Sequence, residues 1–530
     1  MLRGIAGAAC VAAAGRLSAA PKADKRPNIL FIMSDDHSCN TIGAYGSKIG
    51  KTPNIDRLAK QGALLLNSFC ANSICSPSRA SILTGLHSHK NGVTYNGAIW
   101  NGKQTVYSRL LGNAGYDTAL IGKWHQRPPT PTTEVNYWEV LFGHGGQGTY
   151  HDPLMATSKG QRTYKGYSTD IIASKAIDWL TKKWDRAKPF MLMAQFKAPH
   201  VPRQPPERHF DTYPEKSIPL PETFFDDFKG RAPYADKAWM KVWDGRPAKR
   251  SHFPRPATSE EKKGWSKLGP QQRKWAQRQD KRNIDYHKRF KDGEFTDGRV
   301  YAAYRYRRDM QDYLGCVSAV DDNIGRLVDW IDKQGLGKET IVVYCSDQSY
   351  FIGEHGWMEK RWMYEEGLRM PFVFRWLGNI YPETEIKFMV QNIDYAPTFL
   401  AAAGVEIPPE MDGMNMLPLL QGQCDIKWRD AIYYHYYHHG AHNVPRHDGV
   451  RTDRYKLIHY YTDNVYEMFD LDEDPNELKS VHKDPKYAEI RKKLNTRLLA
   501  MRRDLKVPKK AYRHPYVHLS RAEREAMKRK

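Results

Sequence analysis

Four apolar runs of strand length, spread widely along the chain, each end at a cluster of polar residues. Runs of about four to eight apolar residues that stop at polar or turn residues are typical of strands buried in a sheet. Apolar residues at helical spacing over 170–184 and 309–330, and a Thr-Pro start with a Gly stop around 52–62, predict helices between them. We therefore expect an α/β fold with a large, mostly parallel central sheet flanked by helices. The four runs are Asn28–Met33, Thr118–Ile121, Phe190–Ala194 and Thr340–Tyr344.

Residues that can carry chemistry follow each of these runs. Because the carboxyl ends of parallel strands meet at one edge of a sheet, where α/β proteins bind ligands, we expect these side chains to lie together. One pair of adjacent aspartates is by itself more often a turn or a helix cap. A second pair of oxygen-bearing side chains at another strand end favours a shared site instead. The residues concerned are Asp35, Asp36, Lys123, His125, His200, Asp347 and Gln348.

Two regions depart from this alternation. Residues 205–308 are rich in Pro, Lys, Arg and Trp without a clean period, which predicts an irregular basic insertion that either lines a substrate path or is a solvated surface excursion. Residues 425–505 contain aromatic and His-rich runs, which predict a small C-terminal antiparallel sheet with one covering helix. We therefore expect a catalytic domain over 27–424 that includes the insertion, a C-terminal subdomain over 425–505 and a basic tail over 506–530. The predicted C-terminal strands are 431–439, 454–461 and 465–471, and the helix is 485–501.

The chain of 530 residues is strongly basic, with 82 Lys+Arg against 60 Asp+Glu and a formal net charge of +22. Such an excess suggests an anionic partner, which can be nucleic acid, acidic lipid or an acidic glycan. The basic residues form no recognisable motif for reading nucleic acid, and a polyanionic glycan explains the charge as well, so we expect no nucleic-acid partner. No uninterrupted apolar run of about 18 residues occurs, so we expect no membrane span.

The N-terminus and the cysteines bear on the cellular compartment. Residues 1–20 place Arg3 before a small apolar stretch and end in Ser18-Ala-Ala20, the pattern of a weak secretory signal. We expect export to the periplasm or out of the cell; the alternative is a disordered N-terminus of a cytosolic protein. The seven cysteines are scattered and contain no Cys-x-x-Cys pair, which excludes a zinc ribbon or a dense disulfide framework.

The most informative stretch is Cys75-Ser-Pro-Ser-Arg79, which is followed by Ala-Ser-Ile-Leu-Thr84-Gly85. A cysteine in front of a helix is by itself more often a small buried hydrophobe than a nucleophile. The full string, however, resembles the C-x-P-S-R…T-G signature of the type I sulfatases, within the alkaline phosphatase-like superfamily. The resemblance implies that a separate formylglycine-generating maturation enzyme oxidises Cys75 to formylglycine, whose hydrated aldehyde is the nucleophile. It also implies that Arg79 holds the nucleophile's hydroxyl and the carboxylates of a metal site.

The strand-end carboxylates match the metal residues of sulfatases position for position. A hard divalent cation prefers oxygen ligands, and it can polarise sulfate oxygens and lower the pKa of a bound hydroxyl. Gln348 stands where many relatives have Asn or His, which leaves the geometry intact and the ion open between Ca²⁺ and Mg²⁺. The ligands implied by the resemblance are Asp35, Asp36, Asp347, Gln348 and the modified Cys75.

Further residues match catalytic positions of the family. In Gly122-Lys123-Trp-His125 the family's lysine binds sulfate and its histidine assists breakdown of the sulfated intermediate. His200, after Lys-Ala-Pro, matches the histidine that contacts sulfate and protonates the leaving oxygen, and Lys360 matches a second sulfate lysine. A sulfate ester carries spread negative charge, so its hydrolysis needs such a cluster of positive charge. The resemblance implies that one hydroxyl of the diol attacks sulfur and that the second, deprotonated by His125, expels sulfate.

The substrate class is indicated by two stretches that are similar to bacterial sulfatases acting on N-acetylglucosamine 6-sulfate or other glycan sulfates. They are Tyr433–Leu457 and Gln147–Tyr150. Aromatic planes, histidines and arginines are suited to holding a sugar ring and further anionic groups. We therefore expect His435, His447 and Arg451 to line the substrate pocket. The alternative is that alternating Tyr and His form an amphipathic strand with one wet face.

Two other functions are compatible with the fold. A phosphodiesterase or phosphomonoesterase of the same superfamily would share the metal and the sheet. The intact maturation signature and the paired lysines argue against it. A glycan-binding protein without turnover would need a broken catalytic set, whereas none of the expected residues is missing. The sequence thus favours a sulfuric ester hydrolase that acts on sulfated carbohydrate.

Overall fold

A ten-stranded sheet forms the centre of the protein in a computed structural model that describes residues 26–243, 247–438 and 443–509. The order of its strands is β11-β2-β10-β9-β1-β8-β4-β5-β6-β7. The four apolar runs form the middle of this sheet, where β9, β1, β8 and β4 are parallel neighbours. The expected mostly parallel α/β sheet is therefore confirmed. The four strands are β1 (Asn28–Ser34), β4 (Asp117–Gly122), β8 (Phe190–Gln195) and β9 (Thr340–Ser346).

Shorter strands extend the sheet on both sides. On one side β10 runs antiparallel to β9 and to β2, and β11 runs parallel to β2. On the other side β5 is parallel to β4, whereas β6 and β7 continue antiparallel. A separate pair, β3 (Ser68–Phe69) and β12 (Val390–Gln391), lies outside this sheet. The outer strands are β2 (Ala63–Leu65), β5 (Tyr137–Leu141), β6 (Leu154–Thr157), β7 (Gly160–Thr163), β10 (Phe372–Arg375) and β11 (Thr384–Ile386).

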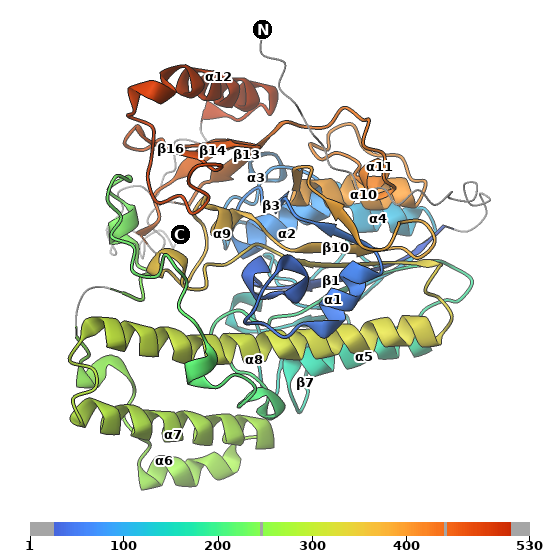
Figure 1. Ribbon diagram of the computed structural model, residues 1–530. Helices are drawn as coiled ribbons and strands as arrows, with labels where there is room; N and C mark the ends of the chain where they lie inside the picture. The colour runs from blue at the N-terminus through green and yellow to red at the C-terminus, as the bar shows by residue number, and fades with distance from the viewer. Residues whose placement is uncertain (1–25, 244–246, 439–442, 510–530) are drawn as a thin grey trace, which may run out of the picture.

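Helices cover both faces of the large sheet (Figure 1). One face carries α1 (Pro53–Lys60), α5 (Ser168–Lys182) and the long α8 (Gly298–Lys333). The opposite face carries α2, α4 and α10, which share one apolar cluster with the sheet. Both groups contain buried apolar residues at helical spacing, which is why they pack on the sheet. The helices of the second group are α2 (Cys75–Thr84), α4 (Tyr107–Asn113) and α10 (Tyr395–Ala402).

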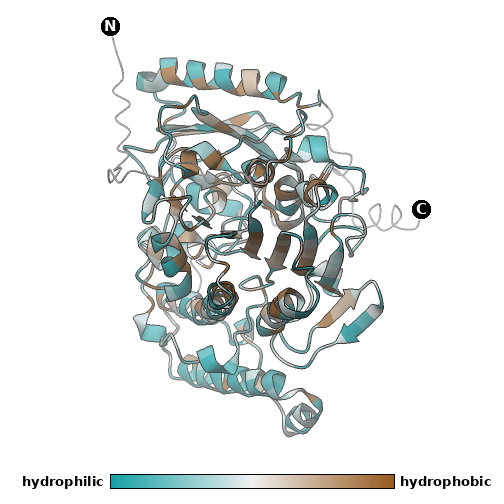
Figure 2. Ribbon diagram, turned by 90° about the vertical axis from the view of Figure 1, so that its right-hand side faces the viewer, coloured by the Kyte–Doolittle hydropathy of each residue, from teal (hydrophilic) through white to brown (hydrophobic). Residues whose placement is uncertain are grey.

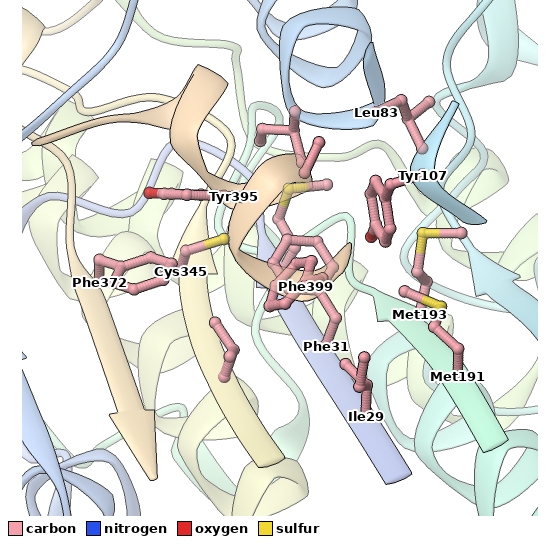
Figure 3. Close-up of a cluster of buried hydrophobic side chains, with 14 of the residues drawn as sticks. Ile29, Phe31, Leu83, Tyr107, Met191, Met193, Cys345, Phe372, Tyr395 and Phe399 are labelled. Carbon is pink, nitrogen blue, oxygen red and sulfur yellow. The ribbon is translucent and has the colours of Figure 1, made fainter. Parts of the chain in front are cut away.

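Alternate residues of the central strands face the two cores, as the period of a strand requires. Ile29 and Phe31 of β1 lie in the cluster beneath α10 and α4, and Figure 3 shows them with Met191 and Met193 of β8. The ring of Phe31 packs edge-on against Phe399 of α10 at 5.6 Å between centroids. Because neighbouring strands bury both of their faces, their sequences read as continuous apolar runs rather than as alternating ones.

The C-terminal sheet is antiparallel and has four strands in the order β13-β14-β15-β16, with α12 (Ala488–Asp504) packed against it. The prediction of a small antiparallel sheet with one helix is confirmed. The sequence did not indicate β14, because its buried residues include His447 and Asp448, and a charged strand shows no apolar pattern. The strands are β13 (Ala431–Tyr436), β14 (His447–Thr452), β15 (Tyr455–Tyr460) and β16 (Val465–Asp470).

The insertion at 205–308 is more regular than its sequence suggests. It contains α6 (Ser259–Gly264), the 22-residue α7 (Pro270–Lys291) and the first turns of α8. The prediction of an irregular segment is wrong over these helices. Most positions of α7 hold Lys, Arg and Gln, which are good helix formers but give no apolar period. The helices α6 and α7 at the bottom of the molecule are accordingly mostly hydrophilic in Figure 2, whereas the central strands are hydrophobic.

Parts of the predictions lie outside the described residues. These parts are the signal segment at 1–20 and the tail beyond residue 509. The domain boundaries at 27, 424 and 505 stay predictions. Among the described helices, none has both the length and the apolar character that crossing a bilayer requires.

Candidate active site

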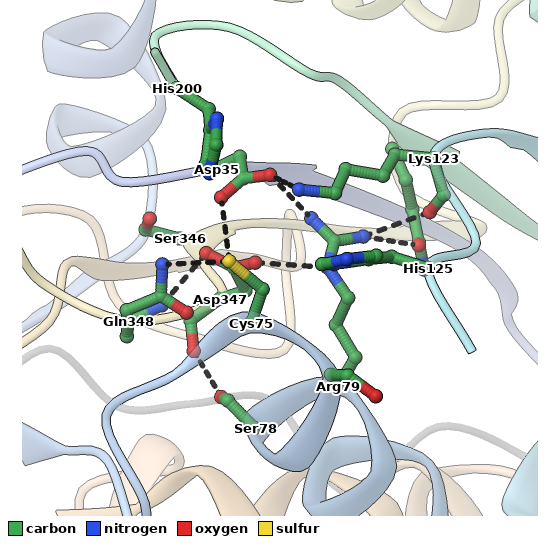
Figure 4. A network of polar contacts seen from close by, with 12 residues as sticks. Asp35, Cys75, Ser78, Arg79, Lys123, His125, His200, Ser346, Asp347 and Gln348 are labelled. Carbon is green, nitrogen blue, oxygen red and sulfur yellow. Dashed lines mark hydrogen bonds and ion pairs between the residues drawn. The ribbon is translucent and has the colours of Figure 1, made fainter. Parts of the chain in front are cut away.

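The polar residues predicted to meet at one edge of the sheet do meet there (Figure 4). Asp35 and Asp36 follow β1, and Asp347 follows the neighbouring β9. Oxygen atoms of these three carboxylates all lie within 4.8 Å of one another, and all three side chains are fully buried. Gln348 joins them, since its amide donates a hydrogen bond to a carboxylate oxygen of Asp36. Three carboxylates are therefore buried together at this edge of the sheet.

Cys75 is the first residue of α2 and points into this cluster. Its thiol lies 3.4 Å from Oδ1 of Asp35, and its Sγ accepts a contact from Nε2 of Gln348 at 3.7 Å. Burial raises the pKa of the Cys75 thiol to about 12, so the thiol is protonated at neutral pH. A protonated thiol is a weak nucleophile, so Cys75 is poorly suited to attack in its unmodified form.

Arg79 lies one turn further along α2 and contacts residues at the ends of four strands. Its Nε donates to Oδ2 of Asp347 at 2.9 Å, and its Nη1 donates to the main-chain carbonyl of Lys123 at 2.8 Å. The same nitrogen reaches Oε1 of Gln195 at 2.9 Å, and Nη2 lies 3.7 Å from Asp35. A planar guanidinium with several fixed donors suits this role, so Arg79 orients the carboxylates around Cys75.

Two buried lysines face the carboxylates. The ammonium group of Lys123 pairs with Asp35, and that of Lys360 donates to Oδ1 and Oδ2 of Asp36 at 2.5 and 2.6 Å. Burial lowers the pKa of Lys123 well below its usual range. Burial also opposes the charge on Lys360, but the charge of Asp36 outweighs it and raises the pKa of Lys360. Lys123 and Lys360 are thus the two lysine side chains that lie against the carboxylates beside Cys75.

Two histidines complete the cluster. Burial, with the charges of nearby lysines, lowers the pKa of His125 and of His200 well below 6.5. Both imidazoles are therefore neutral at pH 7. Nδ1 of His200 is 2.6 Å from the main-chain carbonyl of Val201 and donates to it, which leaves Nε2 on the side of Asp36, at 3.8 Å. His125 is 3.1 Å from the amide nitrogen of Gln147, a residue of a stretch that the sequence analysis singled out.

The three residues predicted to bind substrate lie in the C-terminal sheet, and the structure does not bring them into this cluster. The ring of His435 stacks on that of Tyr437 with 3.6 Å between the centroids, and the ring of His447 stacks on that of Trp362 with 6.1 Å between the centroids. Arg451 pairs with Glu365 at 3.3 Å. Both histidines are fully buried, so the wet face considered as the alternative does not form at these positions. Their part in substrate binding stays a prediction.

Some residues at the site escaped the sequence analysis. Tyr313 of α8 donates to the main-chain carbonyl of Asp36 at 2.7 Å and accepts from the amide of Ser38 at 2.9 Å. Gln195 at the end of β8 accepts from Arg79. Tyr313 gave no signal, because its helix reaches the site only through the tertiary fold. Gln195 and Lys197 did give a sequence signal, since they lie between the apolar run 190–194 and His200.

Comparison with known proteins agrees with this site. Residues 27–405 match the sulfatase family, and residues 353–504 match the family described as N-sulphoglucosamine sulphohydrolase, C-terminal. The chain is 39% identical over 482 residues to an N-acetylglucosamine-6-O-sulfatase of Bacteroides thetaiotaomicron, covering 89% of this chain and 85% of the relative. It is 24% identical to an N-acetylglucosamine-6-sulfatase of Capra hircus, covering 79% of this chain and 68% of the relative.

A solved structure is similar throughout its length. It shows a protein in complex with its substrate, D-glucosamine-2-N,6-O-disulfate. The match has a TM-score of 0.85 and 36% sequence identity, and it covers 92% of this chain and 100% of the other. Family, relatives and fold therefore agree, and the chain belongs to the sulfatase family of alkaline phosphatase-like fold.

Proposed function

We propose that this sulfatase removes the 6-O-sulfate from glucosamine or N-acetylglucosamine units of a sulfated carbohydrate. The observation that carries the proposal is the similarity of this chain to a relative, at 39% identity, and to a solved structure, at 36% identity, whose descriptions share this chemistry. The relative is an N-acetylglucosamine-6-O-sulfatase, and the protein in the solved structure has D-glucosamine-2-N,6-O-disulfate as its substrate. The basic charge of the chain supports a polyanionic glycan as the natural source of such units.

The acidic cluster fits a divalent cation, for which we propose Ca²⁺, with Mg²⁺ as the alternative. Three buried carboxylates gather at one point, and burial together with the charge of Asp347 raises the pKa of Asp36, although Lys360 opposes this. The amide oxygen of Gln348 is buried and has no hydrogen-bond partner among the described residues. Asp35, Asp36, Asp347 and Gln348 would hold the ion, together with the modified Cys75. When bound, the ion supplies Lewis-acid polarisation of sulfate oxygens and lowers the pKa of a coordinated hydroxyl.

Cys75 is proposed to be converted to formylglycine by a separate maturation enzyme. The position of Cys75 beside Asp35 and Gln348 supports this, as does the raised pKa of its thiol. As formylglycine, the residue supplies a hydroxyl nucleophile that the thiol cannot provide. Arg79 orients the carboxylates around this residue through its bonds to Asp347 and to the Lys123 carbonyl.

The lysines and histidines divide the remaining roles. Lys123 and Lys360 bind sulfate oxygens and stabilise the negative charge that builds up on them. A sulfate between the lysines offsets their charge, so the pKa of His200 rises on binding and Nε2 takes up the proton that it passes to the leaving sugar oxygen. His125 is neutral and buried, which is the form that a general base requires.

Export to the periplasm or out of the cell is also proposed, on the basis of residues 1–20. Sulfated polysaccharides are too large to cross a membrane unaided, so an enzyme acting on them gains from export. Mass analysis of the protein recovered from the periplasm or the medium tests this. Recovery of the full-length chain from the cytosol alone would contradict it.

The proposed function is tested on protein made together with its maturation enzyme. Mass spectrometry of the tryptic peptide with Cys75 should show a loss of about 18 Da, the change from thiol to aldehyde. Ion chromatography should then detect sulfate released from N-acetylglucosamine 6-sulfate, but not from the 3-sulfate isomer or from galactose 6-sulfate. Chelation should abolish release, and added Ca²⁺ should restore it better than Mg²⁺.

Each alternative has its own outcome in this experiment. Release from galactose 6-sulfate alone would reject the proposed sugar and keep the sulfatase. An unmodified Cys75 together with hydrolysis of a phosphate diester would instead support a phosphodiesterase of the same superfamily. Full activity of metal-free protein would reject the metal site.

A further inference from the structure

Lys197 is a buried lysine at the edge of the sheet where Asp35, Cys75 and Asp347 meet, which we call the catalytic edge. The roles assigned above leave this lysine unused. It lies two residues past the end of β8, and its side chain is 3% exposed. Its main-chain carbonyl accepts a hydrogen bond from the amide of His200 at 3.1 Å. This bond closes a tight turn, so the backbone of Lys197 is fixed relative to the proposed proton donor.

The ammonium group of Lys197 makes no hydrogen bond or ion pair within the described ranges 26–243, 247–438 and 443–509. The ammonium group lies over the ring of Tyr150, at 5.3 Å from its centroid. Lys123 and Lys360, by contrast, each pair with a carboxylate. Burying an ammonium group without a counter-charge is unfavourable. An anion from outside the chain would provide the missing partner.

Lys197 interacts electrostatically with the residues around Cys75. Burial lowers the pKa of Lys197 to about 8, and the charge of the nearby Asp36 opposes this effect. The charge of Lys197 in turn lowers the pKa of Lys123, His125 and His200. Four side chains that can carry positive charge thus face three carboxylates at this edge: Arg79, Lys123, Lys197 and Lys360. A bound divalent cation would add to the excess of positive over negative charge. Such a site favours an anionic ligand.

We propose that Lys197 is a further sulfate-binding residue, whose ammonium group donates to an oxygen of the bound sulfate group on the His200 side of the site. It adds a third lysine to Lys123 and Lys360. The inference rests on the proposed function for the identity of the sugar, but the binding of sulfate itself can be tested separately. The competing explanation is that Lys197 only packs on Tyr150.

The first test measures binding of inorganic sulfate to the full chain by isothermal titration calorimetry, in Ca²⁺ and at constant ionic strength. K197M should weaken sulfate binding by about ten- to a hundredfold, because a charge-assisted hydrogen bond to a buried anion is lost. K197R keeps the charge and should stay within about fivefold of the wild type. The matched control is K175M, because Lys175 also lies over a tyrosine ring, Tyr164 at 4.1 Å, but on α5 and away from the site.

The second test separates binding from packing by kinetics on N-acetylglucosamine 6-sulfate. K197M should lower kcat/KM and raise the inhibition constant of inorganic sulfate by similar factors, while K175M changes neither. A packing role predicts instead that K197M lowers the melting temperature and leaves the sulfate inhibition constant of the folded fraction unchanged. K197Q, which keeps a polar head group, takes the place of K197M if that variant does not fold.

The outcomes separate this inference from the proposed function. A folded K197M or K197Q that binds sulfate as tightly as the wild type would overturn the inference, as would a wild-type protein that binds no sulfate. A wild type that does not hydrolyse 6-sulfated glucosamine, but whose sulfate affinity depends on Lys197, would overturn only the proposed substrate.

Discussion

The catalytic edge and the C-terminal sheet both bury many charges, but they treat them differently. In the C-terminal sheet opposite charges form ion pairs with one another. The ammonium of buried Lys456 lies 2.9 Å from the carboxylate of Glu365 and 2.7 Å from that of Glu477. At the catalytic edge most charges also pair, but the amide oxygen of Gln348 has no hydrogen-bond partner in the described structure. The ammonium of Lys197 lies over the ring of Tyr150 instead of against a carboxylate. Charges that satisfy one another hold a fold together, whereas charges left open prepare a site for a ligand.

The largest expected effect comes from breaking the catalytic edge at Cys75. C75A should lower sulfate release by at least about a thousandfold, because it removes the proposed nucleophile. Its melting temperature should stay close to that of the wild type, since only one small side chain is truncated. Sulfate release and thermal unfolding of the two proteins provide the measurement.

The matched control for this variant is C70A, which truncates another fully buried cysteine in the segment before α2. It should retain activity. Equal losses of activity in C70A and C75A would mean that local packing, and not a nucleophile at Cys75, explains the result.

Breaking the ion pairs of Lys456 in the C-terminal sheet should have the opposite effect, a loss of stability with little loss of activity. K456M leaves Glu365 and Glu477 without their shared cation, and the free energy of unfolding should fall by about 3 kcal/mol, as for other broken buried pairs. The kcat/KM of the folded protein should change little. Denaturant unfolding, with exposed Lys333 changed to Met as control, measures the loss. A K456M protein that is as stable as the wild type but inactive would undo the contrast between the two regions.

The most gradual effect concerns pH, because it is spread over more than two pH units, and it sharpens the contrast. Burial lowers the pKa of His447 from 6.5 to about 4, so the folded protein keeps this imidazole neutral while the unfolded chain takes up a proton below pH 6.5. The stability that the neutral His447 contributes is therefore complete above pH 6.5. Between pH 6.5 and 4, titration of this group lowers the free energy of unfolding by about 1.4 kcal/mol per pH unit.

His447→Gln removes this titration. Urea unfolding between pH 7 and 4.5 should show a shallower loss of stability for the variant than for the wild type. Identical slopes for the two proteins would show that His447 does not titrate differently in the folded and unfolded chains.

The sequence predicted the parts of the protein that short, local residue patterns determine. The strands β1, β4, β8 and β9 were recognisable because each is buried on both faces and is therefore continuously apolar. The residues of the catalytic edge were recognisable because they follow these strands directly or lie in a specific motif. The positions of Asp35 beside Cys75 and of Lys360 beside Asp36 agree with that expectation.

The remainder depends on contacts between distant segments. The helix α7 and the strand β14 are rich in charge, so their apolar faces are too narrow to show a period, and partners elsewhere in the chain stabilise them. Asp448 of β14, for example, pairs with Arg502 of α12 at 2.6 Å. Tyr313 reaches Asp36 from a helix that begins in the insertion. Pairings of this kind cannot be read from local sequence.

The helix α8 has a consequence for how a long substrate would be received. It is a single helix of 36 residues, about 54 Å long, that begins beside α7 and carries Tyr313 to the main chain of Asp36. Swinging the α7 region over a substrate as a lid would require bending this helix or breaking the bond from Tyr313. The α7 region is therefore held in a fixed position relative to the sheet edge that carries Asp36, and a swinging lid at that place is not part of this fold.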